Sequence, residues 1–144
     1  MEVIWKTVTV ILNQRLRMAI TFPEVLHGFR SGRGAGTASL KAKLIQQLTA
    51  MKVEVLYDIF LDLYKAYNDL DSDTCLGILT AYGLGKRAIY PIQRYWDRLT
   101  MVDQGGGYSG TPFKVFWGFN NGDPLSSTVF KIMVDAMVWN WVRW

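Results

Sequence analysis

The sequence has 144 residues, of which 50% are hydrophobic, so it is long enough to bury one core. Lys and Arg exceed Asp and Glu by four, and the excess lies in residues 1–52, which hold eight basic and two acidic residues. A single cysteine and a single histidine exclude an intramolecular disulfide and the common zinc patterns.

Two helices joined by a loop are expected in the basic half. Residues 3–20 and 37–51 carry apolar side chains at the spacing of amphipathic helices. Residues 21–36 contain Pro23 and four glycines, which predicts a loop. The basic side chains suit contact with a polyanion, although an ordinary solvated surface explains the same charges.

Residues 57–63 predict a strand in which Asp62 is unusual. Side chains alternate between the two faces of a strand, so Asp62 lies on the less apolar face of this one with Asp58 and Phe60. Aspartate is disfavoured in strands and costly to bury unpaired. Asp62 therefore requires a partner, which could be a hydrogen-bonding group or a divalent metal ion.

Two further helices are expected after the strand. Asp71 or Ser72 can cap a helix that ends at Gly83. Residues 85–100 predict another helix, in which Pro91 should introduce a kink or delay the start.

A hairpin and a closing helix complete the chain. Glycines between residues 100–102 and 112–119 predict the hairpin, and Pro124 suits the first turn of a helix. The expected buried side chains of this helix are Val129, Phe130, Met133, Val134, Met137 and Trp141. The order of elements predicts an α+β fold with a small antiparallel sheet packed by helices.

Three motifs resemble those of a known family. They are His27-Gly28-Phe29-Arg30-Ser31-Gly32-Arg33-Gly34, Phe60 to Asp71 with Asp62-Leu63-Tyr64-Lys65-Ala66-Tyr67, and Gly118 to Phe130 with Asn121-Gly122-Asp123-Pro124-Leu125-Ser126. Their order and spacing resemble the fingers motif and palm motifs A and B of reverse transcriptases of the non-LTR retrotransposon and group II intron type. The resemblance covers nearly the whole chain. It implies one partial right-hand polymerase domain over residues 1–144, with fingers-like helices and a basic loop in 1–52 and an incomplete palm in 53–144.

The resemblance also implies roles for individual residues. Asp62 and the backbone carbonyl of Leu63 correspond to ligands of the two catalytic magnesium ions, which lie about 4 Å apart in such sites. Tyr67 corresponds to the aromatic residue beneath the sugar of the incoming nucleotide. The remaining nucleotide-binding positions are Arg30, Arg33, Asn121, Gly122 and Pro124. The implied partners are an RNA template, a DNA primer and deoxynucleoside triphosphates.

Departures from the family pattern limit the expected activity. Asn68 stands where a second aspartate is common, and Asn121 where a glutamine is usual. The Asp-Asp dipeptide of motif C does not occur in this sequence. We therefore expect the intact parent protein to catalyse two-metal nucleotidyl transfer, and we expect these 144 residues alone to have no polymerase activity.

A non-catalytic alternative uses the same residues. Arg30, Arg33, Lys41 and Lys43 would contact nucleic-acid phosphates, and the exposed apolar surface of the aromatic C-terminal helix would bind a protein partner or allow self-association. No signal peptide pattern opens the sequence, and no apolar run of about 18 residues is present. We expect an intracellular protein, cytoplasmic or nuclear, without a membrane partner.

Overall fold

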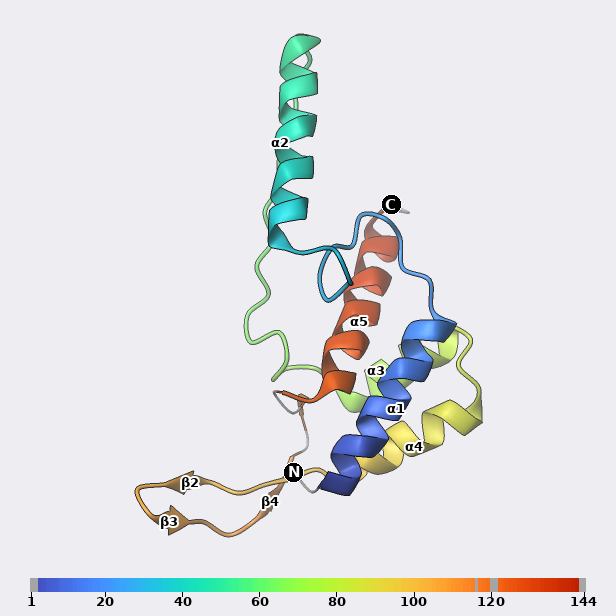
Figure 1. Ribbon diagram of the computed structural model, residues 1–144, viewed down its shortest axis with the longest axis vertical. Helices are drawn as coiled ribbons and strands as arrows, with labels where there is room; N and C mark the ends of the chain where they lie inside the picture. Colours follow the sequence, from blue (N-terminus) through green and yellow to red (C-terminus); the bar gives the residue numbers. More distant parts are fainter. Residues whose placement is uncertain (1–2, 116, 120–121, 143–144) are drawn as a thin grey trace. The chain divides into compact units, whose positions relative to one another are not determined.

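The computed structural model describes residues 3–115, 117–119 and 122–142 (Figure 1). The elements in chain order are α1 Val3–Ala19, α2 Ala35–Met51, α3 Ser72–Ala81, α4 Lys86–Asp97, β1 Thr100–Met101, β2 Gln104–Gly105, β3 Tyr108–Ser109, β4 Phe113–Lys114 and α5 Pro124–Val142. They form two compact units: Phe22–Tyr64, and Met1–Thr21 together with Lys65–Trp144. The structure is mostly helical and has small antiparallel sheets, which is compatible with the expected α+β class. The right-hand polymerase fold stays a prediction.

The unit that contains α1 and α3–α5 holds the hydrophobic core. Helix α5 packs against α1 and α3, and α4 packs against α3 and α1 (Figure 1). Each helix contributes apolar side chains three or four residues apart, as a buried helical face requires. The buried side chains include Leu12 and Leu16 of α1, Cys75 and Leu79 of α3, Ile92 and Trp96 of α4, and Leu125, Val129, Ile132 and Met133 of α5.

Aromatic rings join neighbouring elements of this unit. The rings of Trp5 and Tyr95 lie 5.8 Å apart between α1 and α4. Trp96 stacks on Phe119 at 4.8 Å, which fixes the segment before α5 against α4. The predicted division at residue 52 differs from this packing, because α1 groups with the C-terminal part of the chain.

Local signals set the ends of the helices as predicted. The carboxylate of Asp71 accepts a hydrogen bond of 2.8 Å from the Thr74 N–H at the start of α3. Gly83 follows the end of α3 with φ +87°, a conformation that favours glycine. Of the two effects expected from Pro91, a kink or a later start, the later start is wrong: α4 begins at Lys86 and continues through the proline. Only the N–H that would bond to the Arg87 carbonyl is missing.

The predicted hairpin is confirmed, although its strands are short. Thr100 pairs with Lys114 and Met101 with Phe113 in the β1–β4 sheet. The β2–β3 pair closes the tip around the two glycines at 106 and 107, which both have positive φ. This hairpin extends away from the helices of its unit (Figure 1).

The unit Phe22–Tyr64 contains one helix, α2, in which the structure buries no side chain. The predicted strand at 57–63 is wrong, since these residues form no ladder and expose their apolar side chains, with Phe60 at 90%. A strand is stable only when a neighbouring strand satisfies its backbone groups, and the described residues offer none to this segment.

The predicted burial of α5 is confirmed only over its first part. Val129 and Met133 are buried, whereas Met137 and Trp141 are 53% and 57% exposed. The neighbouring helices cover the N-terminal turns of α5 and not the later ones. None of the helices in the described residues is long and apolar enough to cross a membrane.

Candidate nucleotide-binding site

The turn before α5 is built by three residues of the third motif. Gly122 has φ +87°, and Pro124 opens the helix, where its missing N–H costs little. Between them, Asp123 is 4% exposed and accepts a hydrogen bond of 3.2 Å from the Leu125 N–H through Oδ1. Its Oδ2 is buried without a hydrogen-bond partner in the described part of the chain. The turn therefore contains a buried acceptor oxygen beside the helix N-terminus.

The end of the second motif is hydrogen-bonded to Gly118 and Phe119, which begin the third motif. The Phe119 N–H donates to the Tyr67 carbonyl at 2.9 Å, and the Gly118 N–H donates to the Leu70 carbonyl at 2.8 Å. Gly118 has φ +84°, and a Cβ there would lie 2.7 Å from the Asn68 carbonyl oxygen. Only glycine permits this approach, so Gly118 brings the two motifs together.

Tyr67 faces α5 from this junction. Its ring stacks on that of Phe130 with centroids 4.8 Å apart and planes inclined by 28°. Burial raises the pKa of the Tyr67 phenol. The ring is half-buried, which leaves part of an aromatic surface available to a ligand. Sequence reasoning selected Tyr67 but missed Phe130 as its support, because the contact joins residues far apart in the chain.

A row of polar side chains along α5 is buried and was not predicted. Ser126, Thr128, Lys131 and Asp135 are each at most 5% exposed. Asp135 accepts a hydrogen bond of 2.7 Å from the Tyr82 hydroxyl at the end of α3. Burial, and then the Asp135 carboxylate, raise the pKa of Tyr82 well above its ordinary range. The Tyr82–Asp135 bond joins α3 to α5, and no periodicity in the sequence distinguishes the four buried polar residues from exposed ones.

The two arginines predicted to bind nucleotide bond within their own loop in the unit Phe22–Tyr64. Arg30 Nη1 donates to the carbonyls of Pro23 and Leu26 at 2.8 and 3.2 Å. Arg33 Nη1 donates to the Glu24 carbonyl at 2.7 Å, and its Nη2 donates to the Glu24 carboxylate. The structure therefore brings Arg30 and Arg33 together around Glu24, a residue that sequence reasoning did not select.

Asp62 and Leu63 lie in the exposed segment that replaces the predicted strand. Among residues 3–115, 117–119 and 122–142, no group of three or more His, Cys, Asp and Glu side chains could hold a metal ion. One carboxylate and one carbonyl do not make a magnesium site, which needs several oxygen ligands. Asp62 and Leu63 by themselves thus supply only part of the ligand set of the two-metal centre that the resemblance implies. Asn121, also predicted to contact nucleotide, lies outside the described residues.

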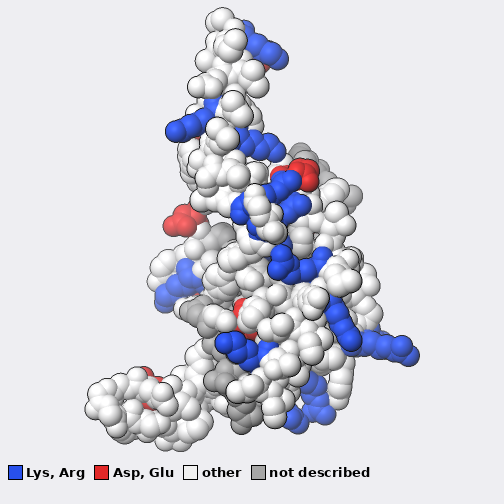
Figure 2. Space-filling model, in the orientation of Figure 1, with Lys and Arg blue, Asp and Glu red and all other residues white. Residues whose placement is uncertain are grey.

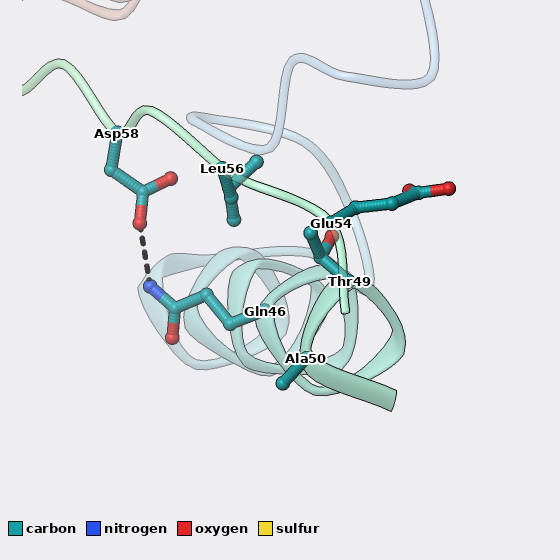
Figure 3. Close-up of a pocket in the computed structure, with 6 residues that line it drawn as sticks. All are labelled: Gln46, Thr49, Ala50, Glu54, Leu56 and Asp58. Atoms are coloured by element: carbon teal, nitrogen blue, oxygen red, sulfur yellow. Dashed lines mark hydrogen bonds between the residues drawn. The ribbon is translucent and has the colours of Figure 1, made fainter. Parts of the chain in front are cut away.

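A pocket of about 280 Å³ lies between α2 and the chain that follows it (Figure 3). Gln46 Nε2 donates a hydrogen bond of 2.8 Å to Asp58 Oδ2 across this pocket. Glu54 also lines it, and the Glu54 N–H donates to the Thr49 carbonyl at 3.1 Å. These bonds hold residues 54–58 along α2. Asp58 therefore contacts a helix and does not form part of the predicted strand.

Tyr67 stacked on Phe130 forms an aromatic platform on α5, and the Tyr67 carbonyl accepts a hydrogen bond from the Phe119 N–H before this helix. No protein-family model matches this chain. The chain is similar to the retrovirus-related Pol polyprotein from the type-2 retrotransposable element R2DM of Drosophila melanogaster, with 25% identity over 137 residues. The alignment covers 95% of this chain and 13% of that polyprotein. The similarity relates this chain to a retrotransposon polyprotein and supports a retroelement-related function.

Proposed function

We propose that this chain is part of a reverse transcriptase domain and carries some of its nucleotide-binding surface. The observation that supports this proposal is the junction of two motifs through Gly118, together with the stacking of Tyr67 on Phe130 of α5. A half-buried aromatic ring supported by a second ring suits contact with the apolar face of a sugar. The similarity to a retrotransposon polyprotein supports the same function.

In this proposal each motif has a separate task. Tyr67 lies beneath the sugar of the incoming nucleotide and disfavours a 2′-hydroxyl. Gly122 and Pro124 form the turn beside the new base pair, and Arg30 and Arg33 bind the triphosphate. Asp62 and the Leu63 carbonyl would hold part of a magnesium centre, whose ions would activate the primer hydroxyl. Among the described residues no group of three or more His, Cys, Asp and Glu side chains could complete such a centre, so we expect polymerase activity only when further ligands are supplied.

Nucleotide selectivity tests the proposal without requiring catalysis. The binding of dUTP and of UTP, which differ only in the 2′-hydroxyl, would be compared by calorimetry in the presence of an annealed RNA template and DNA primer. We expect tighter binding of dUTP, and a ratio of the two affinities that falls towards one in Tyr67→Val. Tyr67→Phe, which keeps the ring on Phe130, is the matched control and should retain the preference. An equal preference in Tyr67→Val and the unaltered chain would contradict the role of Tyr67.

A second candidate function is the non-catalytic binding of nucleic acid or protein. It is favoured by α2, whose apolar side chains Leu40, Leu44, Ile45, Leu48 and Met51 are all at least 46% exposed. On the face shown in Figure 2, Lys and Arg side chains are more widespread than Asp and Glu side chains. Asp62→Asn separates the two functions. It should abolish metal-dependent activity of a complete domain, and leave simple phosphate binding unchanged or slightly stronger.

A further inference from the structure

In the loop between Pro23 and Gly34, the guanidinium groups of Arg30 and Arg33 donate hydrogen bonds to backbone carbonyls. Nη1 of Arg30 donates to the carbonyls of Pro23 and Leu26, and Nη1 of Arg33 donates to the Glu24 carbonyl. The Nη2 atoms of both arginines face the Glu24 side chain instead. Arg30 Nη2 lies 3.8 Å from Glu24 Oε1, and Arg33 Nη2 bonds to Oε2. One edge of each guanidinium thus holds the loop, and the other meets a single carboxylate.

The carboxylate is much more accessible than the cations beneath it. The Glu24 side chain is 74% exposed, whereas those of Arg30 and Arg33 are 22% and 27% exposed. The hydrogen bond and charge of Arg33, followed by the charges of Arg30 and Lys41, hold the pKa of the Glu24 carboxyl below its usual range. Three cations therefore favour an anion at this position, and the anion present can move into solvent.

The rest of the loop does not depend on the Glu24 carboxylate. His27 Nδ1 lies 2.8 Å from Thr37 Oγ1, which also accepts a hydrogen bond of 2.9 Å from the Gly34 N–H. These contacts join the loop to the start of α2, whose first turn contains no acidic side chain. The helix N-terminus adds a partial positive charge nearby. If the carboxylate left, both Nη2 groups would remain in place with free donors.

We propose that Glu24 is an internal competitor for the phosphate group that Arg30 and Arg33 bind. Carboxylate and phosphate both present paired oxygens that accept from a guanidinium, so one can replace the other. In the free chain Glu24 occupies the two arginines, and the phosphate of an incoming nucleotide displaces it. This inference rests on the proposed function, which assigns the two arginines to the triphosphate.

Binding of pyrophosphate to three forms of the chain tests the competition. Calorimetric titrations would compare the unaltered chain, Glu24→Gln and Glu54→Gln. Because an exposed ion pair contributes little, we expect Glu24→Gln to bind pyrophosphate about two- to fivefold more tightly. Glu54→Gln removes the same charge from the same unit without contacting either arginine, and should keep the original affinity. Arg33→Ala combined with Glu24→Gln should lose the gain.

The outcomes separate this inference from the function on which it rests. Equal affinity in the unaltered chain and Glu24→Gln would overturn the competition and leave the arginines as phosphate ligands. No binding by any form would overturn both the competition and the role of the arginines. If Glu24→Gln fails to fold, nuclear magnetic resonance of the unaltered chain gives the answer. Saturating pyrophosphate should return the Glu24 pKa towards its ordinary value, and an unchanged pKa would refute displacement.

Discussion

The Tyr82 hydroxyl donates a hydrogen bond of 2.7 Å to Asp135 Oδ2 and so joins the end of α3 to α5 across 53 residues of sequence. Asp135 is 2% exposed, and its Oδ1 has no hydrogen-bond partner within the described residues. A buried carboxylate that accepts from a single side-chain donor within the described residues depends strongly on that donor. The pair therefore marks a point at which the packing of the core is sensitive to one atom.

Removing the donor should destabilise the fold. We expect Tyr82→Phe to lower the free energy of unfolding by about 1–3 kcal/mol, because it leaves a buried charged acceptor unpaired. Urea unfolding followed by circular dichroism measures the change. Tyr90→Phe is the control, since Tyr90 is 57% exposed and its hydroxyl accepts a hydrogen bond from the exposed Arg94 side chain. Tyr90→Phe should lower the free energy of unfolding by no more than about 0.5 kcal/mol. Equal losses in the two variants would contradict a stabilising role of the Tyr82–Asp135 bond.

Adding one methyl group at Gly118 should separate the two motifs. Gly118→Ala places a Cβ 2.7 Å from the Asn68 carbonyl in a backbone with φ +84°. Gly83→Ala has a similar φ of +87° but meets nothing within 4 Å. The positive φ costs about 1–2 kcal/mol in both variants, and only Gly118→Ala adds a clash. Thermal unfolding should therefore show a clearly larger loss for Gly118→Ala, whereas similar losses would mean that the close approach is unimportant.

Cys75 should be unreactive in the folded chain. Its side chain is fully buried, and burial, with a smaller effect of the Asp71 charge, raises the pKa of the thiol to about 12. At pH 8 almost no thiolate is present, so Ellman's reagent should modify Cys75 only in denaturant. Rapid stoichiometric modification of the native chain would show that the α3–α5 core opens readily.

The cap of α3 should give stability that depends on pH. Bonds from the Thr74 hydroxyl and N–H lower the pKa of the Asp71 carboxyl. Since the folded pKa lies below the unfolded value, the contribution is complete above the unfolded value and is lost as pH falls through the folded one. Asp71→Asn keeps an acceptor without a titrating group. Its thermal midpoint should fall less steeply with acid than that of the unaltered chain, and parallel curves would exclude a role for this carboxyl.

Proteases should cut first between residues 57 and 64. Tyr57 and Phe60 are 87% and 90% exposed, and residues 55–63 make no backbone hydrogen bond within the described part of the chain. Brief digestion with chymotrypsin should release fragments ending at these aromatic residues before α5 is cleaved. Sustained protection of this segment would instead favour the strand predicted from its alternation.

Whether a structural feature could be predicted from the sequence depends on how far apart in the chain the interacting residues lie. The Asp71 cap, the glycine at 83 and the proline at 124 act within one turn of chain, so the bounds of α3 and the start of α5 follow from local sequence. The hairpin follows from its glycines for the same reason. Residues 57–63 have a strand pattern, but pairing requires a second segment that the pattern cannot identify.

The sequence by itself determined the helices, the turns and the residue types available for binding phosphate and sugar. Only the tertiary structure decided that α1 packs with α3–α5, that Gly118 lets Phe119 bond to Tyr67, and that Glu24 faces two arginines. Helix caps and turns depend on neighbours a few residues away, which the sequence states directly. The packing and polar contacts depend on pairs brought together by folding, and their energies appear only when both partners are in place.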